Sequence, residues 1–187
     1  MALHDRLFDL LQSRVARRRP SDQNIGPRDN IYLRRWYVIP RNPLFNIYLH
    51  QFLRSDDDRA LHDHPWLNVS YVLRGSYYEQ TIAAGGVHSR TLRSAGMFAF
   101  RRARQAHRVE LLREGKERFV STMKTRADGT QFVSAVVRAN EIACWTLFIT
   151  GPRIRAWGFH CPAGWVHWKK FTKPGAPGEV GPGCGEA

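Results

Sequence analysis

The sequence has few cysteines, few acidic residues and no long hydrophobic run. Three cysteines in 187 residues are too few for the disulfide framework that stabilises small secreted domains, so we expect the thiols to be reduced. No apolar run approaches the roughly 20 residues of a membrane-spanning helix. Asp5 and Asp9 interrupt the first apolar stretch, unlike the apolar core of a secretory signal. These absences predict a soluble, cytoplasmic protein.

Acidic residues are outnumbered, with 16 Asp and Glu against 29 Lys and Arg, which gives a formal charge of +13. Such an excess attracts phosphate-rich partners whatever the fold. The arginines gather in residues 14–19 and 101–113, but no zinc-finger spacing, helix-turn-helix pattern or aromatic sheet signature accompanies them. Nucleic acid is therefore disfavoured as a partner, and no membrane association is expected.

The 187 residues suffice for a single domain, and most of them form short segments with β-strand character. A helical period occurs only near the N-terminus, where apolar residues stand at 3, 7, 10, 11 and 15 before Pro20. Further on, segments rich in β-branched and aromatic residues alternate with turn residues, which is typical of barrels and sandwiches. Asp128-Gly129 is expected to be a hairpin turn. The expected strands are residues 32–39, 46–53, 67–73, 76–82, 97–100, 107–111, 119–124, 131–137, 143–150 and 165–171.

The most informative segment is His62-Asp63-His64. Two residues separated by one position project to the same side of an extended strand, so both imidazoles can face one cavity and Asp63 faces away. Neutral imidazole is the commonest nitrogen ligand of transition metals. The pattern is compatible with a metal site, although two polar residues on a loop would give it as well.

The spacing around this pair resembles the two motifs of the cupin superfamily. The histidine pair and closing glycine of the first motif, and the opening glycine and histidine of the second, are matched by His62, His64, Gly75, Gly96 and His107. The sequence departs from the motif glutamate, proline, glycine and asparagine at Asn68, Arg102, Arg104 and Leu111.

This resemblance implies an all-β fold, the cupin double-stranded β-helix, an antiparallel jelly-roll barrel. We expect a short N-terminal helix and lead-in segment in residues 1–44, the barrel in residues 45–172, and a flexible, extended C-terminal arm in residues 173–187, which is rich in Gly and Pro. The resemblance also allows a homodimer.

The resemblance further implies that His62, His64 and His107 bind a divalent metal. With Asn68 in the place of the glutamate, three neutral ligands remain, as in cupins that resemble thiol dioxygenases. Fe(II) is therefore favoured, and Zn, Ni or Mn also suit such ligands.

We expect the ligand to be a small, anionic molecule. Arg102 and Arg104 precede His107 and share one strand face, where two guanidinium groups can bind a carboxylate or phosphate; a solvated basic surface is the other interpretation. Further candidates for substrate contact are Asn68, Glu79, His50 and Tyr71.

Three functional classes stay open at this point. The first is a three-His non-haem iron dioxygenase. The second is a non-catalytic cupin that binds or senses a small ligand. The third is a metal-free sugar epimerase or isomerase, which would use a histidine and a tyrosine as base and acid.

Overall fold

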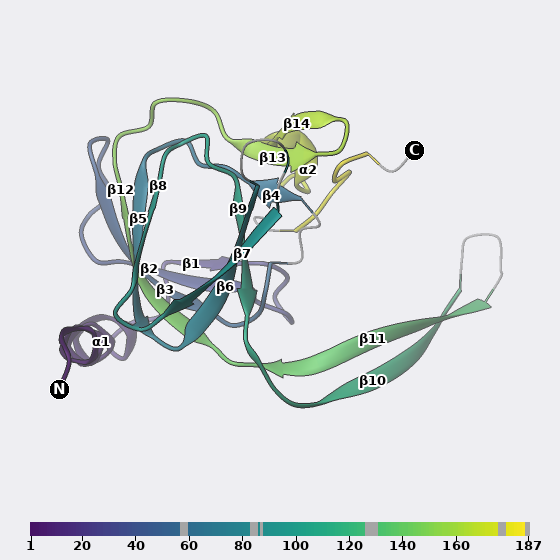
Figure 1. Cartoon of the computed structure of the whole chain (residues 1–187), viewed down its shortest axis with the longest axis horizontal. Helices are drawn as coiled ribbons and strands as arrows, with labels where there is room; N and C mark the ends of the chain where they lie inside the picture. The colour runs from purple at the N-terminus through teal and green to yellow at the C-terminus, as the bar shows by residue number, and fades with distance from the viewer. Residues whose placement is uncertain (57–59, 83–85, 87, 126–130, 176–178, 186–187) are drawn as a thin grey trace.

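The barrel consists of two six-stranded antiparallel sheets that face each other (Figure 1). The computed structural model describes residues 1–56, 60–82, 86, 88–125, 131–175 and 179–185. The first sheet contains, in spatial order, β1 (Gln23–Ile25), β2 (Leu33–Tyr37), β3 (Asn46–Phe52), β12 (Cys144–Thr150), β5 (Asn68–Arg74) and β8 (Phe98–Arg101). The second contains β14 (Gly164–His167), β13 (Gly158–Cys161), β4 (Leu61–His62), β9 (His107–Leu111), β6 (Ser76–Ile82) and β7 (His88–Ser94).

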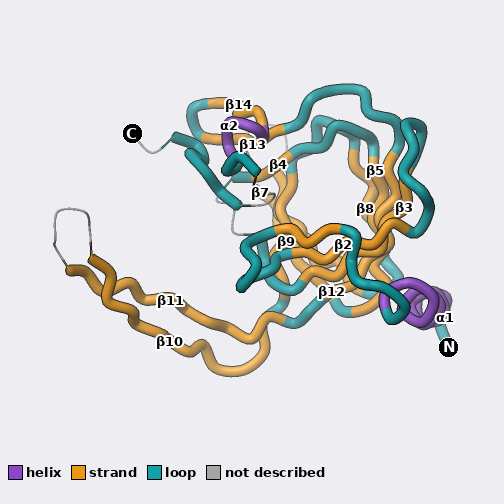
Figure 2. Tube along the Cα trace, turned by 180° about the vertical axis from the view of Figure 1, so that it is seen from behind, coloured by secondary structure: helices purple, strands orange, loops and turns teal. Residues whose placement is uncertain are grey.

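A separate ribbon of two strands leaves the barrel. Strands β10 (Arg113–Thr125) and β11 (Gln131–Glu141) pair with each other in antiparallel register. Figures 1 and 2 show this ribbon projecting well away from the two main sheets. The expected turn at Asp128-Gly129 lies outside the described residues.

Side-chain alternation gives the first sheet two different faces. On β5, Ser70 faces the interior of the barrel, whereas Tyr71 and Leu73 face outward. Helix α1 (Leu3–Leu11) covers part of that outer face and buries Phe8 against it (Figure 2). A short π-helical segment, Gln12–Ala16, extends the helix, and no described helix is long and apolar enough to cross a membrane. The predicted N-terminal helix is thus confirmed and has a packing role.

Two glycines of the cupin-like motifs adopt backbone conformations that suit glycine. Gly75 lies between β5 and β6 with φ +82°, and a Cβ atom there would come within 2.9 Å of the carbonyl oxygen of Ala143. Gly96 precedes β8 with φ +87°. Positive φ is strained for other residues. The motif glycines therefore mark real turns of the barrel.

The predicted strand at residues 165–171 is wrong in its second half. Strand β14 ends at His167, and helix α2 (Trp168–Phe171) follows. His167 caps this helix because its Nδ1 accepts a hydrogen bond from the Lys169 amide at 3.2 Å. Four further strands were not predicted: β1, β4 and β13 are only two to four residues long, and β7 lacks an alternating apolar pattern.

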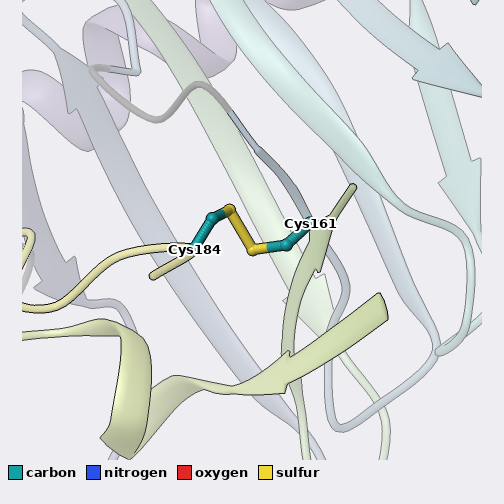
Figure 3. Close-up of a disulfide and its surroundings, with 2 residues drawn as sticks. All are labelled: Cys161 and Cys184. Carbon is teal, nitrogen blue, oxygen red and sulfur yellow. A yellow bond between two sulfur atoms is a disulfide. The ribbon is translucent and has the colours of Figure 1, made fainter. Parts of the chain in front are cut away.

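The C-terminal segment is not an extended arm where it is described. It returns to the barrel, since Gly181 donates its amide hydrogen to the Phe171 carbonyl at 3.0 Å and Cys184 forms a disulfide with Cys161 of β13 (Figure 3). The expectation that these two cysteines are reduced is therefore wrong. A Gly- and Pro-rich composition argues against regular elements, but it does not exclude tertiary contacts. Cys144 is a free, buried thiol.

Candidate functional site

Three histidines meet inside the barrel although they come from separate segments. His62 ends β4 and pairs with His107 of β9, and His64 follows β4, where its amide donates to the Ala103 carbonyl at 3.1 Å. One ring nitrogen from each histidine lies within 4.8 Å of the other two. The Nε2 atoms of His64 and His107 are 2.8 Å apart. The three residues predicted as metal ligands are thus brought together by the fold.

The geometry and protonation of this cluster fit a divalent metal. Two nitrogen ligands at metal distances of about 2.0–2.1 Å and at right angles would lie about 2.9 Å apart, close to the separation of the His64 and His107 nitrogens. Burial lowers the pKa of His62 and places the pKa values of His64 and His107 well below the ordinary range. Neutral imidazole is the form that binds metals, so this donor set suits one.

Carboxylates lie behind two of the three imidazoles. Glu79 places Oε1 3.5 Å from Nδ1 of His107, and Asp56 places Oδ2 3.8 Å from Nδ1 of His62. The same oxygen of Asp56 accepts a hydrogen bond from the Val109 amide at 3.0 Å. Carboxylates near the outer ring nitrogen orient metal-binding histidines. No hydrogen bond joins either pair, and Nδ1 of His107 has no hydrogen-bond partner among the described residues, so the two carboxylates stand beside these rings without fixing the tautomer.

Glu79 belongs to a buried network rather than to the cavity surface. It accepts from Nε of Arg93 at 2.8 Å and from Nε of Arg101, and it is 2% exposed. Arg101 also donates to Oδ1 of Asn68 at 3.2 Å and to the hydroxyl of Tyr77 at 3.1 Å. Neither Asn68 nor Glu79 lines the cavity. Both residues, expected to contact substrate, instead hold Arg101.

Asp63, the residue between the two motif histidines, faces away from them as strand alternation requires. Its side chain accepts hydrogen bonds from the Gly158 amide at 2.9 Å and from Nε1 of Trp165 at 3.0 Å. It also forms an ion pair with Arg155 at 2.8 Å, and its Oδ2 lies 3.2 Å from Nε2 of His160. Asp63 thereby joins the histidine segment to β13 and β14.

The three histidines open onto a cavity of about 520 Å³ between the two sheets. Much of its wall is aromatic, so the cavity can exclude water from flat apolar groups. The aromatic wall residues outside the histidine cluster include Phe52, Trp66, Phe148, Trp157, Phe159 and Trp168.

The structure places the predicted anion-binding arginines outside this cavity. Arg102 and Arg104 are exposed and do not line it, because β8 ends at Arg101 and it is Arg101 that points inward. Tyr71 lies on the outer face of the first sheet, where it stacks on Phe98 with ring centroids 4.2 Å apart. These three predicted contacts are therefore corrected, since Arg102 and Arg104 lie in the turn after β8 and Tyr71 leaves β5 on the outer side.

His50 does line the cavity, together with two residues that the sequence did not single out. Its Nε2 accepts a hydrogen bond from Nε of Arg35 at 2.8 Å, and burial places its pKa well below the usual range. Arg35 lies two positions after the buried Leu33 on β2. Residues two apart on a strand face the same side, so this spacing indicates an inward side chain for Arg35. Asp56 belongs to a run of three aspartates, in which no local signal distinguishes one from the next.

No protein-family model matches the chain, and no curated protein matches it by sequence. Among solved structures it is similar to Fe(II)-HppE with an alternative substrate, at 11% identity and a TM-score of 0.43, over 68% of this chain and 54% of HppE. The chain thus spans about half the length of HppE. It is also similar to Clostridium difficile EutQ, at 9% identity and a TM-score of 0.41, over 72% of this chain and 81% of EutQ.

A third similar structure is an uncharacterized conserved protein with a double-stranded β-helix domain from Klebsiella pneumoniae. The identity is 13% and the TM-score 0.42, over 74% of this chain and 91% of that one. The fold assignment itself rests on the two facing sheets described above.

Proposed function

We propose that this chain binds a divalent metal ion through His62, His64 and His107 and uses it to bind or transform a small molecule in the cavity. The observation that carries the proposal is the convergence of three neutral imidazoles in a buried space, with two ring nitrogens 2.8 Å apart. Because the described residues place no carboxylate among these ligand atoms, Fe(II) is favoured, while Zn, Ni or Mn would suit the same nitrogens.

A metal bound by three protein ligands supplies a Lewis acid, or an iron redox centre, at positions open to the cavity. The chain's own residues would do the rest. Glu79 and Asp56 place carboxylates beside two of the imidazoles, and the aromatic wall keeps bulk water from the ligand. This division of roles supports a mononuclear non-haem iron dioxygenase as the leading reaction class.

A second candidate function is acid–base catalysis without metal, as in sugar epimerases and isomerases. Tyr77 lines the cavity, and burial raises the pKa of its hydroxyl, which keeps the proton that a general acid needs. Arg101 donates to that hydroxyl at 3.1 Å. His107 would be the histidine for such a pair, since both residues line the same cavity.

Metal analysis separates the two candidates. The purified protein is reconstituted anaerobically with Fe(II), Zn, Ni or Mn, desalted and measured by elemental analysis. We expect about one metal per chain, which His62→Ala and His107→Ala lose and which the exposed substitution His88→Ala retains. Folded protein that holds no metal after reconstitution would contradict the metal function and favour acid–base catalysis.

Oxygen uptake then separates catalysis from ligand binding. The iron-loaded protein is assayed with panels of thiols, hydroxy acids and diketones, and a dioxygenase consumes oxygen with at least one of them. A tightly held metal without oxygen uptake would instead favour a binding or sensing protein. The predicted homodimer and cytoplasmic location belong to this proposal too, and sedimentation analysis tests the first.

A further inference from the structure

Arg35 offers the cavity a positive charge that no described carboxylate pairs with. It lies opposite His50 in the register of β2 and β3, and its guanidinium group lines the cavity. Nε donates to His50 at 2.8 Å, Nη1 donates to Oε1 of Gln23 at 3.2 Å, and the guanidinium carbon lies 5.0 Å from the ring centroid of Tyr48. Within the described part of the chain, its partners are neutral side chains.

Arg101 provides the contrast within the same cavity. Its charge is matched by the carboxylate of Glu79, and it is 1% exposed. Burial lowers the pKa of Arg35, which expresses the cost of holding its charge away from water. A charge in such a place is stabilised by an opposite charge. Arg35 is half-buried and no described carboxylate contacts it, so an anion that enters the cavity would be its first charged partner.

The proposed metal ion would add further positive charge to a cavity that already holds the charge of Arg35. A divalent ion on three neutral histidines keeps both of its charges, because Glu79 is already matched by Arg101 and Arg93. Asp56 is the remaining described carboxylate on the cavity wall. The loaded cavity would therefore hold an excess of positive charge, which favours an anionic ligand over a neutral one.

Aromatic groups connect Arg35 to the histidine cluster. The ring of His50 stacks on Phe148 with centroids 5.0 Å apart, and Phe148 lies 5.8 Å from the ring of His64. A ligand that reaches from Arg35 to the metal-binding nitrogens therefore passes along an apolar, flat surface. Two oxygens of one carboxylate or phosphate suit the guanidinium group.

We propose that Arg35 binds the anionic group of the ligand, a carboxylate or phosphate carried on a flat apolar body that lies along Phe148. The proposal names the ligand class of the function proposed above. Only the contact between ligand and metal rests on that function. His50 and Gln23 are positioning residues, since His50 accepts from Nε and Gln23 accepts from Nη1, which leaves Nη2 as the nitrogen for the anion.

The first test uses metal-free protein, so that it does not depend on the metal function. Benzoate, phenyl phosphate and neutral benzyl alcohol are titrated against the fluorescence of Trp66, Trp157 and Trp168, which line the cavity. We expect saturable binding of at least one anion, with benzyl alcohol at least tenfold weaker. The tighter of the two anions identifies the charged group.

Variants then assign the charge to one residue. Arg35→Gln should weaken anion binding about tenfold or more, whereas Arg35→Lys should keep part of the affinity, since a charge-assisted hydrogen bond survives. The matched control is Arg102→Gln with Arg104→Gln, two exposed arginines that should leave the affinity unchanged. Thermal melting of each variant confirms that it is folded.

Two outcomes would overturn this assignment. One is anion binding by a folded Arg35→Gln protein that equals the wild type. The other is binding of benzoate and phenyl phosphate no tighter than that of benzyl alcohol. The same titration in His62→Ala keeps this test separate from the metal proposal: retained anion binding with lost metal supports Arg35, while anion binding that needs His62 contradicts it.

Discussion

The two ends of the cavity are built from different sheets, and among the described residues only one of them has carboxylates beside its polar side chains. The histidine end takes His62 and His107 from the second sheet, with carboxylates behind both rings. The arginine end takes Arg35 and His50 from the first sheet, and the described residues place no carboxylate on that arginine. We propose the first end as the site of a cation and the second as the site of an anionic group.

The two ends also differ in how they are held. Asp63 binds the segment that carries two of the histidines to β13 and β14 through four partners. Arg35 is held by two hydrogen bonds and the Tyr48 ring. Substitutions that disturb one end without the other therefore test whether the cavity has two independent binding elements.

The largest effect is expected from Asp63→Ala. It leaves Arg155 without its carboxylate and removes the acceptor of the Gly158 amide, so we expect the free energy of unfolding to fall by about 3 kcal/mol. Urea unfolding measures the loss, and the exposed Asp29→Ala is the control. The histidine end should lose metal affinity as well. A loss below about 1 kcal/mol would show that Asp63 does not hold this wall.

The next effect comes from the disulfide beside the histidine end. Cys184→Ser frees the C-terminal segment from β13, where Phe159 packs 6.1 Å from the His62 ring. Because the cysteines stand 23 positions apart, we expect a loss of about 3 kcal/mol. Dithiothreitol should lower the melting temperature of the wild type but not of the variant. An identical response of both proteins to dithiothreitol would contradict the disulfide.

A smaller effect separates the two ends directly. Glu79→Gln removes the carboxylate near His107, and such changes lower metal affinity about 10- to 100-fold. Anion binding by the metal-free protein should change little, because Arg35 lies on the other sheet. Metal titration and the fluorescence assay measure the two affinities in one preparation. Equal losses in both would show that the ends are coupled through Arg101.

A separate effect, set by conditions and not by one substitution, is a dependence of stability on pH in metal-free protein. Burial lowers the pKa values of His50, His62, His64 and His107. Below about pH 6.5 the unfolded chain takes up protons on these groups that the folded chain does not, so the free energy of unfolding should fall as pH falls and level off above it. Urea unfolding at pH 7.5, 6.5 and 5.5 measures the slope.

His50→Phe supplies the control for this dependence. It removes one of the four groups and keeps a ring between Tyr48 and Phe148, so its slope should be shallower than that of the wild type. A stability that is constant or rises from pH 7.5 to 5.5 would contradict the shared burial of these histidines.

Local patterns predicted the β segments, and the resemblance to the cupin motifs added the barrel and His107. The spacing of His62 and His64 placed both on one side of the chain, and Gly75 and Gly96 marked turns that need positive φ. The same alternation, applied to Arg102 and Arg104, placed two exposed arginines in the cavity, because the position at which β8 ends decides which arginine faces inward.

The sequence by itself determined the N-terminal helix through its 3.6-residue period, and the resemblance to the cupin motifs implied the fold class and the three candidate ligands. Only the tertiary structure decided that Glu79 lies beside His107, that Arg35 faces the cavity and that Cys184 reaches Cys161. Each of these contacts joins segments far apart in the chain. Their meeting depends on how two sheets pack, which no short spacing encodes.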